Sequence, residues 1–330
     1  MKVCVFGAGA VGGHLAARLG ASSSCELTIV ARGPHLEAIK RSGITLESRE
    51  GTWCARPAVA TDDPSVLPVQ DIVFVTLKST MQSAVARAIR GLVGTGGHAV
   101  FVNNGVPWWW NDASRNLAPL PLIDHGVELW SALGPERAVG CVVYSGNEVL
   151  APARVRHSGG NRWIVGEPDN SLSERVSRTV KLLKAAGLEA EVSCNLRQDV
   201  FAKLLLNASY NSVAALTGLP IEWFSADESV KRLVFEVIDE LAAVARSMGY
   251  DVEAARVTTC KLRRLPDGFS IDQGQRPSML QDVAAGRPTE VEALLGQVCL
   301  FGDEHRVPCP CSKTLLWLLR GVNQRLAASC

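Results

Sequence analysis

A glycine-rich turn directly after the first apolar segment constrains this chain more than any other feature of its sequence. The strand-type run Met1–Phe6 leads into Gly7-Ala-Gly-Ala-Val-Gly12 and an apolar stretch of helical character, Val11–Leu19. In such a unit the first glycine permits a tight turn, the second lets the backbone approach a pyrophosphate, and the third lets helix pack on strand. The helix N-terminus then holds the phosphates. We predict a dinucleotide site formed by Gly7, Ala8, Gly9, Ala10, Val11 and Gly12.

The end of the second apolar segment indicates which dinucleotide is bound. Glu26–Ala31 is rich in β-branched residues, and Arg32 follows it where an NAD-type domain has an acid for the ribose 2′-hydroxyl. An acid there repels a 2′-phosphate, whereas the guanidinium fork of an arginine binds one. We therefore predict NADP(H) rather than NAD(H), with Arg32 at the 2′-phosphate. The alternative is a solvent-exposed arginine at a strand end.

Strand-like and helical stretches alternate through the first half of the chain, as an α/β sheet requires. From Ala138 onward, short strand-like pieces such as 155–157 and 162–165 are separated by glycine and proline, and they are expected to extend the sheet. Beyond Cys194 the sequence is helical in character. For 330 residues this pattern predicts two domains. They are a Rossmann-type dinucleotide-binding domain at 1–194 and an all-helical substrate and catalytic domain at 195–330.

The charge balance and the cysteines exclude several classes of protein. With 34 basic and 33 acidic residues, the net charge of +1 gives no electrostatic case for binding nucleic acid or an anionic membrane surface. Small molecules are the expected partners. The ten cysteines are scattered, and the close pair Cys309-Pro-Cys311 lacks the spacing of a metal or redox pair. Without a recognisable signal peptide or membrane-length apolar run, we expect a cytoplasmic protein with reduced thiols and no metal site.

Two polar positions follow strand-like segments, at the end of the sheet where α/β proteins bind ligands. Lys78 follows Asp71–Leu77, and Asn104-Gly105 follows Ala99–Asn103. Each position also has an ordinary interpretation, because a lysine often ends a strand at the surface and Asn-Gly is a favoured turn pair. The residues alone leave both interpretations open.

A row of polar residues lies along the first helix of the second domain. Lys203, Asn207 and Asn211 recur at four-residue intervals within Asp199–Leu216, so they follow one line with a drift of about 40° per step. Apolar neighbours flank the row, which is too narrow for a solvent face and too polar for a packing face. Burial lowers the pKa of a lysine toward the range where it delivers a proton near neutral pH. The alternative is the polar face of an amphipathic helix.

A second polar segment lies at 276–292. Thr289 and Glu292 match a capping box for the helix that follows. Glu290 is not needed for that box, although an acid in a first helical turn is common. Ser278 is likewise compatible with a helix cap. The residues alone leave functional and structural roles open for Glu290 and Ser278.

Several segments together resemble the ketopantoate reductase family, whose members reduce 2-dehydropantoate to pantoate with NADPH. The resemblance covers nearly the whole chain, and its last two blocks are the most specific. The blocks are Gly7–Gly12, Val30–Gly33, Thr76–Lys78, Asn104-Gly105, His157–Gly159 with Ile164–Glu167, Lys203–Asn207 with Asn211 and Ala215–Thr217, and Ser278–Asp282 through Arg287–Glu290.

The resemblance implies a role for each candidate residue. Lys203 is the implied general acid, which protonates the ketone oxygen as hydride arrives, while Glu290 and Asn207 hold the new hydroxyl. Asn211 and Ser278 are implied to bind the rest of the keto acid. Asn104 and Lys78 are implied to lie close to the nicotinamide and the substrate. The implied function is the NADPH-dependent reduction of 2-dehydropantoate.

The chain departs from the pantoate enzymes after Asn104-Gly105. It continues with Val106-Pro-Trp108-Trp-Trp110 and a longer segment to Gly134, as in a paralogous subgroup. The three tryptophans either reshape the substrate pocket or anchor the insert or a subunit contact. Two further alternatives therefore stay open, a reductase of a bulkier 2-keto acid and a non-catalytic NADP(H)-binding regulatory protein. A homodimer is possible.

Overall fold

Two compact units make up the chain. The computed structural model describes residues 1–111, 118–221, 224, 227–261 and 276–328. Unit 1 comprises Met1–Asn103 and Trp108–Leu196, and unit 2 comprises Asn104–Pro107 and Arg197–Cys330. The division after Leu196 lies close to the sequence-based boundary after Cys194. The sequence-based division does not anticipate that Asn104–Pro107 groups with the helical unit.

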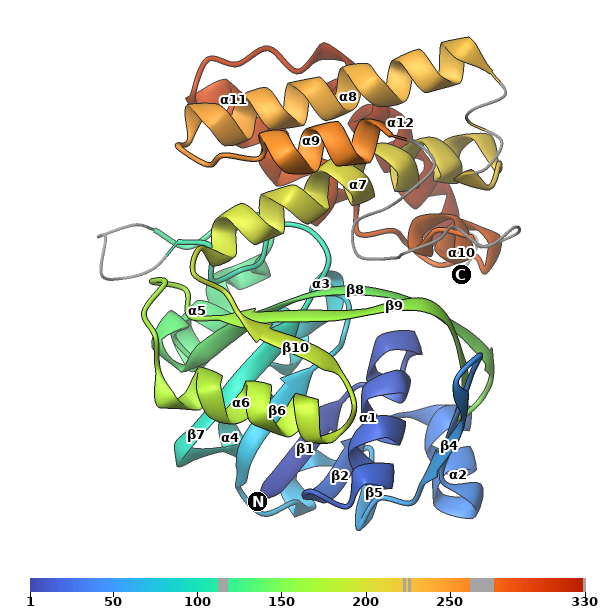
Figure 1. The fold of residues 1–330 in the computed structure, drawn as a ribbon, viewed down its shortest axis with the longest axis vertical. Coiled ribbons are helices and arrows are strands. Elements are labelled where there is room, and N and C mark those ends of the chain that lie inside the picture. Colours follow the sequence, from blue (N-terminus) through green and yellow to red (C-terminus); the bar gives the residue numbers. More distant parts are fainter. Residues whose placement is uncertain (112–117, 222–223, 225–226, 262–275, 329–330) are drawn as a thin grey trace. The chain divides into compact units, whose positions relative to one another are not determined.

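Unit 1 contains a mixed sheet, which the described residues form from ten strands in the order β4-β3-β9-β8-β7-β6-β1-β2-β5, with β10 beside β9 (Figure 1). The pairs β8–β9 and β3–β4 are antiparallel and the other pairs are parallel. The strands are β1 (Lys2–Phe6), β2 (Glu26–Val30), β3 (Ile44–Ser48), β4 (Gly51–Ala55), β5 (Val59–Thr61), β6 (Gln70–Val75), β7 (Val93–Val102), β8 (Ala138–Ala151), β9 (Arg154–Gly166) and β10 (Glu189–Val192).

Helices cover both faces of this sheet, which explains why its central strands are continuous apolar runs. In β1 the alternate residues Val3 and Val5 join one core with α1, α2 and α6, and their neighbours Cys4 and Phe6 are buried on the opposite face. The helix α4 packs against β6 and β7. The helices of unit 1 are α1 (Ala10–Ser22), α2 (Gly33–Ser42), α3 (Ser79–Gln82), α4 (Ala86–Leu92), α5 (Glu128–Ala132) and α6 (Glu174–Ala185).

The strands β8 and β9 are longer than the short pieces expected from sequence. The glycines that separate residues 155–157 from 162–165 do not end the strand, and the pairing with β8 shifts register between Tyr144 and Asn147. Gly160 adopts φ +71°, a left-handed conformation that glycine tolerates. The glycines therefore form an irregularity inside one strand, as in a β-bulge.

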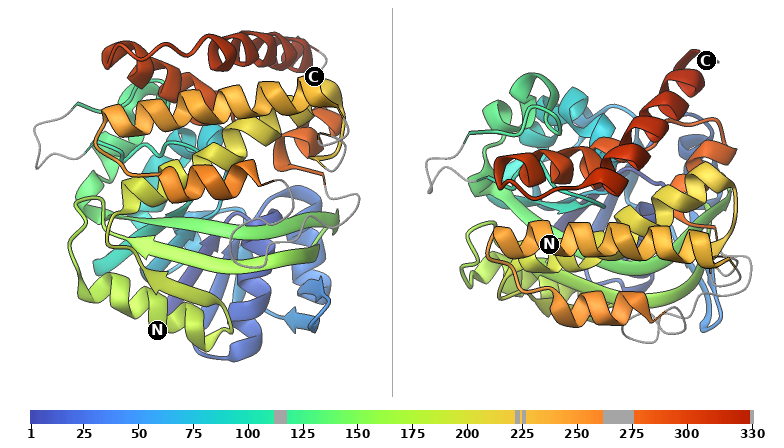
Figure 2. Two further views of the ribbon diagram at one scale, coloured as in Figure 1. Left: turned by 45° about the horizontal axis from the view of Figure 1, so that its top comes forward. Right: turned by 90° about the horizontal axis from the view of Figure 1, so that it is seen from above.

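Unit 2 is helical (Figures 1 and 2). The long helix α8 packs against α9, α11 and α12. Its Glu240 accepts hydrogen bonds from the Cys311 and Ser312 backbone N–H groups at 2.8 and 2.7 Å, so a carboxylate caps the N-terminus of α12. The elements are α7 (Leu196–Thr217), α8 (Glu228–Ser247), α9 (Glu253–Cys260), α10 (Ser278–Ala284), the π-helical turn η8 (Glu292–Gly296), α11 (Gln297–Glu304) and α12 (Pro310–Ala328).

This architecture confirms the predicted fold class, an α/β Rossmann-type domain followed by helices. Among the described helices, none is both long and apolar enough to cross a membrane.

Candidate functional site

The glycine-rich turn joins β1 to α1 in unit 1. Gly7 adopts φ +111°, and its N–H donates to Val30 O at 2.9 Å. A Cβ on Gly12 would lie 1.9 Å from Gly7 O and 2.4 Å from Thr76 Oγ1, so the third glycine is required by the packing of helix on strand. A Cβ on Gly9 would meet nothing within 4 Å, so the space beside the second glycine is open.

The start of α1 has the features of a phosphate-binding helix end. Gly9 is the N-cap and provides no side-chain hydrogen bond, and no acidic residue lies in the first turn. The positive end of the helix dipole is therefore not neutralised locally. Gly9 is exposed and Ala10 and Val11 are half-buried, whereas Gly7, Ala8 and Gly12 are buried. These residues fit the pyrophosphate of a dinucleotide.

Arg32 and Lys78 both lie at helix starts in unit 1. Arg32 is exposed and is the N-cap of α2, just after β2 ends at Val30, and no acid occupies the first turn of α2. Lys78 is half-buried and is the N-cap of α3. The strand before it ends at Val75, earlier than the sequence indicates.

The polar row of α7 is part of unit 2, and two hydrogen bonds join it to Asn104. Lys203 Nζ donates to Asn104 Oδ1 at 2.7 Å, and Asn207 Nδ2 donates to the same oxygen at 3.2 Å. Lys203 is only 8% exposed. The structure thus brings together three of the predicted site residues, and Lys203 does not lie on a solvent face.

The third residue of the row points to α10. Asn211 is buried, and its Nδ2 donates to Ser278 Oγ at 3.4 Å. Ser278 is the first residue of α10, and the N-cap position of that helix is occupied by Pro277. Of the two interpretations that the sequence left open for Ser278, the helix cap is therefore not supported.

Glu290 is buried, two residues before η8. The capping box expected beside it is wrong. Thr289 Oγ1 donates to Asn323 Oδ1 at 3.0 Å, and the Glu292 carboxylate accepts from Arg320 Nε and Nη2, both at 2.7 Å. Both side chains bind residues of α12 and do not cap the helix that follows them. A hydrogen bond to an amide and a charge-assisted ion pair replace the two expected capping bonds. Glu290 keeps its role as a prediction.

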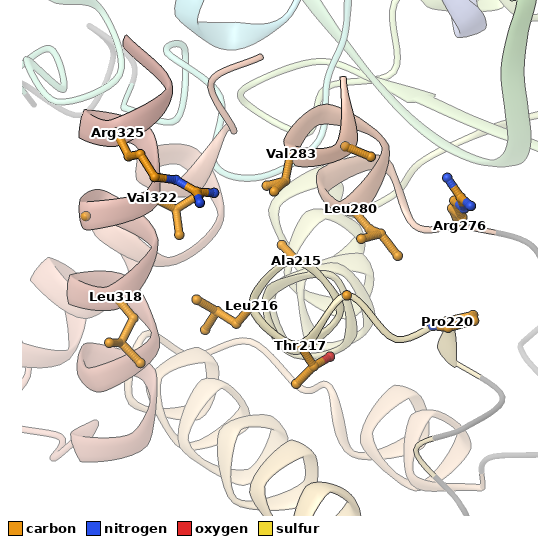
Figure 3. Close-up of a pocket in the computed structure, with 13 residues that line it drawn as sticks. Ala215, Leu216, Thr217, Pro220, Arg276, Leu280, Val283, Leu318, Val322 and Arg325 are labelled. Atoms are coloured by element: carbon orange, nitrogen blue, oxygen red, sulfur yellow. The ribbon is translucent and has the colours of Figure 1, made fainter. Parts of the chain in front are cut away.

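A groove of about 860 Å³ with a mixed polar and apolar lining surrounds the C-terminal end of α7. Ala215, four residues after Asn211, continues the row of α7 into this groove. Figure 3 shows Leu318 and Val322 of α12 across from Leu216, with Leu280 and Val283 of α10 beside Ala215. Two arginines, Arg276 and Arg325, complete the lining together with Thr217, Gly218, Pro220, Ala284 and Gly321.

The three adjacent tryptophans belong to unit 1, and all three are buried. Trp108, Trp109 and Trp110 are 1%, 2% and 3% exposed. The Trp108 ring meets Phe101 edge-on at 5.2 Å between ring centroids. A Cβ on Gly140 would lie 2.3 Å from Trp109 Cζ2, so the sheet leaves space for this indole. Of the two roles considered, an anchor fits this burial better than a pocket wall. Part of the following insert, residues 112–117, lies outside the described residues.

Val106 and Ala293, which had no predicted role, join the segment that contains Asn104 to η8. The Val106 N–H, two residues after Asn104, donates to Ala293 O in η8 at 2.7 Å. No local signal indicates this bond, because a backbone contact between distant segments leaves no pattern in the sequence.

Comparison with known proteins relates both parts of the chain to one family. Residues 3–170 match "Ketopantoate reductase PanE/ApbA", and residues 195–323 match "Ketopantoate reductase PanE/ApbA C terminal". A relative from Mesorhizobium japonicum, named 2-dehydropantoate 2-reductase, is 36% identical over 323 residues, with 97% of each chain covered.

Solved structures agree with this relation. The crystal structure of a ketopantoate reductase-like protein from Ralstonia solanacearum MolK2 is similar with a TM-score of 0.86 and 32% identity, covering 99% of this chain and 98% of that one. D-mandelate dehydrogenase, solved with NADH and anilino(oxo)acetate, gives a TM-score of 0.82 at 18% identity, covering 99% and 100%. At that identity the second likeness shows the fold alone.

Proposed function

The chain belongs to the ketopantoate reductase PanE/ApbA family, a family of oxidoreductases, and from this premise we propose that it reduces 2-dehydropantoate to pantoate with NADPH. The observation that carries the proposal is that Lys203 and Asn207 each donate a hydrogen bond to the same oxygen, Asn104 Oδ1. These two bonds support a buried Lys203 side chain that is held at a defined place among polar groups, as a proton-donating site requires.

Lys203 is the proton donor in this proposal. An ammonium group has three N–H donors and no acceptor. One of them is oriented by Asn104 Oδ1 at 2.7 Å, so the ammonium is held in place before substrate arrives. Lys203 transfers a proton to the ketone oxygen as the carbonyl carbon gains a hydride, and the products are an alcohol and a neutral lysine amine.

The other polar residues of unit 2 orient the keto acid. Asn207 and Glu290 hold the oxygen that becomes the hydroxyl group, and the buried Asn211 with its hydrogen-bond partner Ser278, which is exposed, binds the remainder of the molecule. Burial of Asn211 and Glu290 strengthens their hydrogen bonds to substrate, since little water competes for them.

NADPH supplies the hydride when it is bound. The turn Gly7–Gly12 and the start of α1 hold its pyrophosphate, and the exposed Arg32 at the start of α2 binds its 2′-phosphate. Lys78 and Asn104 lie near the nicotinamide in this proposal. A cytoplasmic location and a possible homodimer remain predictions from sequence.

A bulkier 2-keto acid is the second candidate substrate, and the groove beyond Asn211 favours it. Ala215 gives the polar row an apolar continuation bounded by Leu216, Leu280 and Val283. Such a lining accommodates an apolar substituent.

Loss of NADPH absorbance with a panel of 2-keto acids tests the proposal. The panel contains 2-dehydropantoate, a small aliphatic keto acid and an aromatic keto acid. The highest kcat/KM for 2-dehydropantoate is the expected result. A higher value for the aromatic acid would favour the second candidate. No turnover with any acid, at normal NADPH binding, would make the chain a non-catalytic NADP(H)-binding protein.

A further inference from the structure

The short segment Asn104–Pro107 belongs to unit 2 although the residues on both sides of it belong to unit 1. Its attachment within unit 2 is a backbone hydrogen bond, in which Val106 N donates to Ala293 O at 2.7 Å. Both residues are buried, with 0% and 2% of their surface exposed. The bond is therefore shielded from water, which would otherwise compete for it.

The acceptor in this bond is available because of the π-helical turn η8. In an α-helix each N–H donates to the carbonyl four residues earlier, so Gln297 N would donate to Ala293 O. In η8 the Gln297 N–H donates to Glu292 O instead, five residues earlier. The π turn thus diverts the donor that an α-helix would direct to Ala293 O. π-Helical turns are rare and occur frequently at functional sites.

The contact is also tight, and it requires glycine at position 105. Gly105 adopts φ +82°, and an added Cβ would lie 2.4 Å from Ala293 O and 2.6 Å from the Ala293 carbonyl carbon. Since both atoms are backbone, no side-chain movement relieves the collision. The Asn104-Gly105 pair is therefore a docking element against η8, and not only a turn.

The docked segment determines where Asn104 presents its side chain. Asn104 Oδ1 accepts from Lys203 Nζ and from Asn207 Nδ2, which come from neighbouring turns of α7. We infer that η8 is a positioning element, in which Ala293 O and the Gly105 backbone hold Asn104 so that its amide oxygen orients Lys203. Gly105, Val106 and Ala293 are positioning residues in this inference. Their importance for catalysis rests on the proposed function, whereas the docking itself does not.

The variant Gly105→Ala tests the inference, with Gly249→Ala as its matched control. Gly249 has nearly the same backbone conformation, φ +86°, but an added Cβ there meets nothing within 4 Å. Both variants therefore impose left-handed strain on an alanine, and only one collides with η8. Asn104→Ala is a third variant, which removes the oxygen that Lys203 contacts and leaves the docking atoms in place.

Three measurements are made on the full chain. They are hydrogen exchange of the peptide that covers 104–107, the rate at which an amine-acylating reagent modifies Lys203, and kcat with its pH dependence. For Gly105→Ala we expect faster exchange, faster acylation and a loss of kcat of roughly 10- to 100-fold, as for a displaced catalytic group. For Asn104→Ala we expect faster acylation with wild-type exchange. Gly249→Ala should match the wild type in all three.

Unchanged exchange in Gly105→Ala would overturn the docking role of η8. Faster exchange with unchanged Lys203 acylation, or equal effects in Gly249→Ala, would overturn its positioning role. Neither of these readouts needs turnover. A wild-type protein that reduces no keto acid would therefore contradict the proposed function while exchange and acylation still decide the inference.

Discussion

The two units build their candidate sites in different ways. Unit 1 forms its dinucleotide site from one continuous turn, Gly7–Gly12, in which the absence of side chains provides the space. Unit 2 assembles a polar cluster from side chains that lie far apart in the sequence, Asn104, Lys203 and Asn207. A site made of backbone can be recognised from a short motif, whereas a site made of side chains depends on tertiary packing. The difference also predicts how each unit responds to substitution.

Within the glycine turn, folding and ligand binding should separate cleanly. Gly12→Ala places a Cβ 1.9 Å from Gly7 O, so we expect destabilisation of at least about 5 kcal/mol or failure to fold. Gly9→Ala has open space and an extended φ of −73°, so stability should stay near wild type while dinucleotide affinity falls. Thermal unfolding and calorimetric titration with NADPH measure the two effects. A stable Gly12→Ala protein would show that the packing of α1 on β1 tolerates a side chain.

The tryptophans of unit 1 should affect stability and not substrate choice. Trp109→Ala removes an indole that is 2% exposed, which should destabilise the protein by about 3–5 kcal/mol. Trp317→Ala is the control, because Trp317 of α12 is 62% exposed and should change stability by less than about 0.5 kcal/mol. The ratio of kcat/KM for an aromatic keto acid to that for 2-dehydropantoate should be unchanged in Trp109→Ala. A changed ratio would restore the pocket role.

Arg32 should distinguish the two nicotinamide cofactors. If its guanidinium binds the 2′-phosphate, Arg32→Ala should weaken NADPH binding by about 1.5–3 kcal/mol and leave NADH binding nearly unchanged. Lys40→Ala is the control, since Lys40 is an exposed cation in the last turn of the same helix. Dissociation constants for both cofactors measure the effect. Equal losses for NADPH and NADH would contradict the assignment.

Acid should destabilise the protein through His98, a buried histidine of unit 1. Burial, and then the charges of Arg175 and Arg178, lower the pKa of His98 from 6.5 to about 3. Unfolded His98 therefore binds a proton that the folded protein excludes. The stability from the neutral ring is complete above pH 6.5 and is lost as pH falls toward 3.

The slope in that window is up to about 1.4 kcal/mol per pH unit for one histidine. His98→Gln, which keeps a polar partner for Thr179, should remove that contribution. Urea unfolding at several pH values measures it. The same acid slope in both proteins would show that His98 ionises without cost in the folded state.

The sequence predicted the fold and the members of the polar row, because strand, turn and helix patterns are local. It did not predict the bond from Lys203 to Asn104, since spacing within one helix does not show which loop meets it. The capping box at Thr289 was wrong for the same reason, because Asn323 and Arg320 of α12 bind Thr289 and Glu292. The local sequence does not predict the π turn at Ala293 either, since its backbone bond to Val106 needs no particular side chain.

The turnover of Lys203→Ala decides whether this lysine is the proton donor. A general acid acts on the reaction and not on cofactor binding. We therefore expect Lys203→Ala to lose at least ~10²-fold in kcat for 2-dehydropantoate while its NADPH dissociation constant stays near wild type, and we expect wild-type turnover to decline at alkaline pH. Near-normal turnover by Lys203→Ala would contradict the role of general acid and leave Lys203 as a structural residue of α7.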